Sequence, residues 1–93
     1  MISPQKYSRL SRKQRRQLRE AYVMEQKELC YWCGHLLHNP PPENITNLNI
    51  NWSLFPSGFL NSPIHLQHNH DTDLTEGAVH AYCNAVMWQY HGR

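Results

Sequence analysis

Two short pairs of candidate metal ligands constrain this chain more than any other feature of its sequence. Cys30 and Cys33 are separated by two residues, and so are His80 and Cys83. Zn²⁺ accepts mixtures of cysteine and histidine in a tetrahedral site, and a two-residue spacer lets both members of a pair face one ion. One ion would then join the middle of the chain to its end. We therefore predict a structural zinc site at these four residues.

The length of the chain favours a structural metal site of this kind, and we call the four residues Cys30, Cys33, His80 and Cys83 the clamp. With 93 residues it should form one domain with a limited core, and small domains often need a disulfide or a metal. Three cysteines cannot all pair within one chain. No secretory signal follows Met1, so we expect an intracellular location, where disulfides are rare. No apolar run approaches the roughly 18 residues of a membrane span, so we expect no membrane partner.

Two other ligand sets remain open. His65 and His68 could replace the second pair, although residues of a strand alternate between its faces and Cys83 would then have no role. His35 or His38 could instead join the first pair. Otherwise, His35, His38 and His91 are interpreted as surface or packing residues.

Positive charge is concentrated at the start of the chain. Seven of the nine Lys and Arg residues lie within the first nineteen positions, and no acidic residue precedes Glu20. A solvated helix face usually carries both signs, whereas a one-signed segment is typical of an arm that binds a polyanion. We expect contacts with nucleic-acid phosphates from Arg9, Arg12, Lys13, Arg15, Arg16 and Arg19.

A helix is expected in this basic segment. Ser11 and Gln14 can form a capping box, which predicts a helix from about 12 to 28. Its apolar positions begin only at Leu18, so we expect the first half to lie against another molecule. After a run of prolines, residues 43–62 are predicted to form a long loop, pinned by Trp52, Phe55 and Phe59.

The last thirty residues predict two strands and a helix. Residues 63–68 alternate as in a strand, residues 77–82 suit a second strand, and a polar loop joins them. Apolar positions then recur at helical spacing, and Gly92 is placed to stop the helix. The expected fold class is α+β, with residues 1–28 forming a basic arm and helix and residues 29–93 a zinc-bound domain.

Twenty residues carry a more specific pattern. His65, Gln67, His68, His70 and Thr72 have the spacing of the first half of a nuclease motif, and His80, Cys83 and Asn84 have the spacing of its second half, with Gly77 in register. With the upstream cysteine pair, residues of about 28–92 resemble the HNH nucleases, also called ββα-metal or His-Me finger nucleases. The similarity is to the branch typified by phage recombination endonuclease VII.

The resemblance implies a fold and a reaction. It implies a ββα-metal domain, encoded by a phage, that hydrolyses DNA phosphodiester bonds and leaves 5′-phosphate and 3′-hydroxyl ends. His68 would be the general base, since an imidazole titrates near neutral pH. Asn84 would hold a catalytic Mg²⁺ or Mn²⁺, with Gln67 or His70 as helpers; alternatively, His70 would contact the scissile phosphate. A single site in a short chain favours nicking, unless two copies act together.

This sequence departs from the family pattern at three positions. His80 replaces a cysteine, which zinc tolerates. Gln67 replaces the Asp that precedes the general base, and Asn69 replaces the following Asp. Mg²⁺ prefers carboxylate and phosphate oxygens, so these amides weaken the expected catalytic site. The alternative is a non-catalytic, zinc-bound DNA-binding module with a degenerate HNH site.

Overall fold

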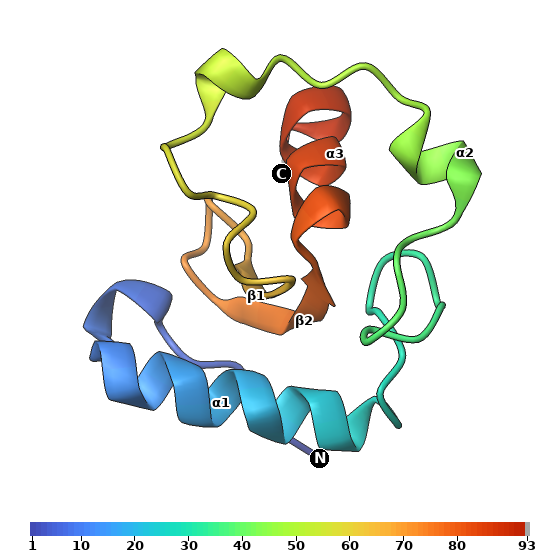
Figure 1. Cartoon of the computed structure of the whole chain (residues 1–93). Coiled ribbons are helices and arrows are strands. Elements are labelled where there is room, and N and C mark those ends of the chain that lie inside the picture. Colours follow the sequence, from blue (N-terminus) through green and yellow to red (C-terminus); the bar gives the residue numbers. More distant parts are fainter. Residues whose placement is uncertain (93) are drawn as a thin grey trace.

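Two antiparallel strands and the helix that follows them form the centre of the molecule (Figure 1). The structure is a computed structural model that describes residues 1–92. Strand β1 spans Ile64–His68, strand β2 spans Thr75–His80, and helix α3 spans Ala81–His91. The basic helix α1 spans Arg12–Glu25 and lies beside the hairpin, after a short 3-10 turn at Tyr7–Arg9. The chain is therefore a small α+β protein with a two-stranded sheet.

The hairpin contains an irregularity beside the candidate site. Gln67 pairs with Gly77, but the next residue, His68, pairs with Thr75. Glu76 is thus the extra residue of a β-bulge, which interrupts the alternation of faces along the strand. All five residues of β1, from Ile64 to His68, line one groove, so the bulge lies at the end of the strand beside this groove.

The predicted ends of the helices can now be compared with the observed ones. The capping box is confirmed: Ser11 Oγ accepts a hydrogen bond from the Gln14 amide at 3.1 Å, and the Gln14 side chain accepts one from the Ser11 amide at 2.8 Å. The prediction that α1 continues to residue 28 is wrong, because Lys27 and Glu28 have positive φ values of 56° and 65°. The stop at Gly92 is confirmed, with a left-handed φ of 68°.

Two other boundaries differ from expectation. The second strand covers Thr75–His80 rather than 77–82, since residues 81 and 82 already belong to α3 and the strand starts immediately after the loop. Residues 43–62 are not one long loop: they contain α2 at Glu43–Thr46 and a 3-10 turn at Trp52–Leu54. Ile45 of α2 is buried, so tertiary packing stabilises a helical turn too short to form alone.

The core joins all of these elements. Tyr22 of α1, Leu37, Ile45 and the first turns of α3 form one buried cluster with Ala78 and Val79 of β2. The Tyr22 hydroxyl also lies 3.0 Å from Thr75 Oγ1, which ties α1 to the hairpin. The second half of α1 is therefore part of the core. Within residues 1–92, no helix is both long and apolar enough to span a bilayer.

Candidate functional site

Four potential metal ligands meet in the core. The sulfurs of Cys30, Cys33 and Cys83 and a ring nitrogen of His80 all lie within 4.8 Å of one another. His80 Nδ1 is 3.4 Å from Cys33 Sγ and 3.6 Å from Cys83 Sγ. In a tetrahedral zinc site, Zn–S bonds of about 2.3 Å and Zn–N bonds of about 2.0–2.1 Å place a sulfur ligand and a nitrogen ligand about 3.6 Å from each other. The cluster is thus arranged as a possible zinc site, formed by the predicted residues.

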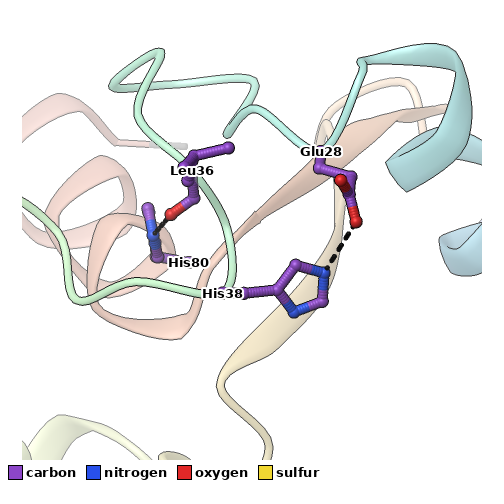
Figure 2. Close-up of polar contacts among 4 residues, drawn as sticks. All are labelled: Glu28, Leu36, His38 and His80. Carbon is purple, nitrogen blue, oxygen red and sulfur yellow. Dashed lines mark hydrogen bonds and ion pairs between the residues drawn. The ribbon is translucent and has the colours of Figure 1, made fainter.

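The tautomer of His80 suits this role. Its Nε2 lies 2.9 Å from the Leu36 carbonyl and 2.8 Å from the Asn39 carbonyl, and the first contact is drawn in Figure 2. Carbonyl oxygens can only accept, so Nε2 must carry the proton. In the neutral ring, Nδ1 then presents its lone pair to the sulfurs. Histidines that bind metals are commonly oriented by such a hydrogen bond from their other nitrogen.

The environment of the cysteines also favours a cation. Cys30 and Cys83 are buried, and Cys30 Sγ accepts backbone hydrogen bonds from Trp32 and Cys33. A hydrogen bond from the Cys83 thiol lowers the pKa of Cys30 to about 4. For Cys83, the same hydrogen bond is the largest cause of a raised pKa, and burial is the second. One sulfur is therefore ready to bind as a thiolate, and a metal ion would displace the protons of the others.

The alternative ligand sets are not brought together. His38 points away from His80 toward Glu28, with His38 Nε2 3.3 Å from the carboxylate (Figure 2). His35 is exposed. His65 and His68 lie in a groove on another part of the surface. The arrangement favours the first ligand set, with His80 and Cys83.

The groove is the second candidate site. It is open to solvent, with a volume of about 840 Å³. One wall is the arginine face of α1, which we define as Arg12, Arg15, Arg16 and Arg19. The spacing of i, i+3, i+4 and i+7 places these four side chains on one side of the helix. The same groove is also lined by His65, Gln67, His68, His70 and Asn84.

This arrangement divides the predicted phosphate-binding residues into two groups. The four arginines of the arginine face line the groove with the candidate catalytic residues. Arg9 and Lys13 are exposed and do not line it. The first half of α1, which has no apolar positions, therefore borders a groove of this protein.

His68 is held by an aromatic neighbour from the N-terminal arm. The Tyr7 ring stacks on its imidazole, with centroids 3.9 Å apart and planes 8° from parallel. The guanidinium of Arg15 lies over the same tyrosine at 4.0 Å and donates a hydrogen bond to the Tyr7 carbonyl. The arm is fixed in turn by Asp73, whose carbonyl accepts from the Tyr7 amide at 2.8 Å. Tyr7 thus orients His68 from a distant segment.

The charge state of His68 follows from this packing. Burial lowers its pKa below the ordinary value of 6.5, and the neighbouring His70 and Arg15 act in the same direction. Asp73 and Glu76 oppose them. His70 lies edge-on, with ring centroids 4.6 Å apart. At neutral pH, His68 is therefore uncharged and able to accept a proton.

The other two predicted site residues have different partners from those expected. The Asn84 side-chain nitrogen lies 3.1 Å from His65 Nδ1. Gln67 is only 2% exposed, and its amide donates to the His68 carbonyl and to Glu76. Neither contact places a carboxylate beside Asn84. Asn84 and Gln67 nonetheless line the groove with His68 and His70.

Sequence reasoning missed two residues of this site. The sequence places His65 in the motif and in an alternative zinc set, but gives it no role in the catalytic site, although it lines the groove and contacts Asn84. Its position two residues before Gln67, on the same strand face, could have indicated this. Tyr7 carries no local signal, because its contact with His68 depends on docking of the arm.

The geometry must be interpreted without help from known relatives. Comparisons with protein-family models, with curated proteins and with solved structures find no match to this chain.

Proposed function

We propose that this chain is a zinc-stabilised endonuclease of the HNH type that nicks DNA. The observation that carries the proposal is the shared groove, which is lined both by the arginine face of α1 and by His68, His70 and Asn84. Arginines bind phosphate oxygens through paired hydrogen bonds, and a neutral imidazole can accept a proton from water. Both functions are needed to hydrolyse a phosphodiester bond.

The reaction can be assigned to residues of the groove. His68 takes a proton from a water molecule, whose oxygen forms a bond to phosphorus while the bond to the 3′ oxygen breaks; the leaving 3′ oxygen takes a proton from solvent water to become the hydroxyl end. Burial lowers the pKa of the imidazole and so favours its neutral form, and stacking against Tyr7 limits its rotation. Arginines of α1 balance the negative charge that develops on the phosphate. His70, exposed beside His68, is placed to contact the same phosphate.

The clamp helps to hold one residue of this groove, Asn84, in position. Cys30, Cys33, His80 and Cys83 would hold one Zn²⁺, which would fix the end of β2 against the first turn of α3. Asn84 directly follows the last ligand, so its position depends on the clamp. The ββα-metal assignment of the fold rests on this strand–strand–helix order together with the motif.

The fit of a catalytic Mg²⁺ is poor. This hard cation prefers anionic oxygens, whereas Gln67 and Asn84 supply neutral amides that already contact other groups of the protein. The use of Mg²⁺ or Mn²⁺ therefore remains a prediction, and the steps above do not depend on it. The imidazole of His65 beside Asn84 would suit Mn²⁺ better than Mg²⁺.

Supercoiled plasmid tests the proposal directly. Purified protein should convert it to the nicked circle, and we compare reactions with Mg²⁺, with Mn²⁺ and without added ion. Gln67→Asp should lower the ion concentration required, because it adds a carboxylate at the family position. Absence of nicking by the wild type under every condition would refute the proposed activity.

One observation favours a second candidate, a DNA-binding module without activity. The Gln67 side chain is buried and directed at Glu76, as expected if this position no longer binds a metal. Nicking by Gln67→Asp but not by the wild type would support this second function.

A further inference from the structure

A third part of the groove has no role in the proposed hydrolysis. Next to the histidines, it is lined by Phe55, Phe59 and Trp88, which we call the aromatic wall. Phe55 contacts both other rings, with centroids 4.8 Å from Phe59 and 5.4 Å from Trp88. Phe59 packs edge-on against His65 at 4.7 Å, so the wall reaches the His65–Asn84 pair.

The aromatic wall is accessible to solvent at Trp88. Trp88 is 40% exposed although it is a large aromatic residue on α3. Its ring lies at the surface of a groove that also holds four arginines. An apolar ring beside a row of positive charges suits a ligand that has flat apolar faces and regularly spaced anions. A nucleic-acid strand has both.

Whether the bases are stacked or unstacked distinguishes duplex DNA from single-stranded DNA as a ligand for this wall. In a duplex, the faces of the bases are covered by their neighbours and only their edges are accessible in the grooves. Aromatic side chains can stack only on bases that are unstacked, as in a single strand or a flipped nucleotide. The aromatic wall would therefore have no partner in regular duplex DNA.

We propose that the groove binds single-stranded DNA, with an unpaired base stacked on Trp88 and the adjoining phosphates on the arginine face of α1. The proposal rests on the proposed function and specifies its substrate: the bond cleaved lies in or next to an unpaired stretch. The path of the strand follows from successive contacts: Trp88 touches Phe55, Phe55 touches Phe59, and Phe59 touches His65, from which β1 leads to His68. The base would be held at one end of the groove while the phosphate reaches the histidines.

The chain offers a matched control for Trp88. Trp52 is also 40% exposed and also packs against Phe55, with centroids 5.8 Å apart, but it does not line the groove. Trp88→Leu and Trp52→Leu remove the same ring from equally exposed positions beside Phe55, although Trp52 also packs edge-on against Tyr82 at 5.4 Å. Loss of packing should therefore be similar in the two variants, and only Trp88→Leu should remove the stacking surface. Trp88→Phe retains a smaller ring.

The experiment measures fluorescence anisotropy of a labelled single strand and of the same strand annealed to its complement. For the binding measurements all variants carry His68→Ala, so that no cleavage occurs; nicking of plasmid and cleavage of both ligands are measured separately, on the same variants with His68 retained. We expect tighter binding of the single strand, about tenfold weaker binding after Trp88→Leu, and partial recovery in Trp88→Phe. Trp52→Leu should match the parent, and Trp88→Leu should leave duplex binding unchanged.

Three results would overturn the inference: equal affinity for single strand and duplex, equal losses in the two tryptophan variants, or an equal effect of Trp88→Leu on both ligands. Any of these, with DNA binding and nicking intact, would refute the single-strand assignment and leave the proposed nuclease function standing. Single-strand binding that depends on Trp88, without cleavage of either ligand, would support this inference and refute the nuclease function.

Discussion

The clamp and the groove are built from residues of similar kinds, yet their construction differs. The clamp residues lie in two short segments, and three of the four are buried. The groove combines the N-terminal arm, α1, β1, the loop before it and α3, and much of its lining is exposed. Histidine takes part in both, but His80 is fixed by two carbonyls, whereas His68 is held by a stacked ring.

This contrast indicates how each site tolerates change. Removal of one buried ligand would deprive the other three of the zinc ion that we expect them to share, and the core itself contains Cys30 and Cys83. An exposed groove residue such as Arg16 or His70 can be changed with little effect on the core, because it faces solvent. We therefore expect clamp variants to lose the fold and groove variants to lose binding or reaction.

The largest effect is expected at the clamp. Cys83→Ala should unfold the protein, because zinc binding is worth about 10–16 kcal/mol in small zinc domains and whole domains are stable by only about 5–15 kcal/mol. Metal analysis should find one zinc per chain in the wild type, and circular dichroism should show the loss of structure in the variant. His38→Ala is the control, since its exposed ion pair with Glu28 should contribute at most about 1 kcal/mol. A well-folded wild type without metal would remove the contrast between the two regions.

The second-largest effect is expected on the rate of nicking, with the fold retained. His68→Ala should lower the rate of nicking by about 10²–10⁴-fold, the usual contribution of a general base, while the melting temperature and DNA affinity change little. His35→Ala removes an exposed histidine outside the groove and should nick like the wild type. If His68→Ala unfolded the protein, the groove would be as structural as the clamp. If it nicked normally, another residue would be the base.

A smaller effect separates the two faces of α1. Arg16→Gln should weaken DNA binding and reduce the slope of log affinity against log salt by about 0.7–0.9, because one phosphate contact is lost. Lys13→Gln removes the same charge from the same helix, outside the groove, and should leave the slope nearly unchanged. The measurement is a salt titration of duplex and single-stranded binding. Equal slopes for the two variants would show that the helix acts through its net charge alone.

The smallest effect is a shift in pH dependence. The base must be unprotonated, so the rate of nicking should rise with pH through the pKa of His68. Because burial lowers that pKa, the midpoint should lie below the ordinary value of 6.5. Tyr7→Ala exposes the imidazole, which should raise its pKa and move the midpoint to higher pH, whereas Tyr7→Phe keeps the stack and should leave it unchanged. A midpoint that Tyr7→Ala does not move would mean that the ring does not control His68.

Short-range sequence patterns were enough to predict the residues of the clamp and the order of the basic helix, the two strands and the last helix. Pairs such as Cys30 and Cys33 have ligand geometry that depends mainly on a two-residue spacer, and the capping box and Gly92 act over a few residues. Element ends were less predictable. Residues 81 and 82 read as strand from their neighbours, but helix α3 is buried through its first turns and begins directly after His80.

The sequence by itself determined which residues could bind zinc, where the positive charge lies and where the strands and the last helix form, because these depend on spacing and composition. Only the tertiary structure decided that the arginine face of α1 and His68 line one groove, that Tyr7 covers the His68 ring, and that Asn84 meets His65. The most distant of these partners, Tyr7 and His68, are 61 residues apart in the sequence. No local pattern encodes them, because they arise when α1 and the arm pack on the hairpin through Tyr22 and Asp73.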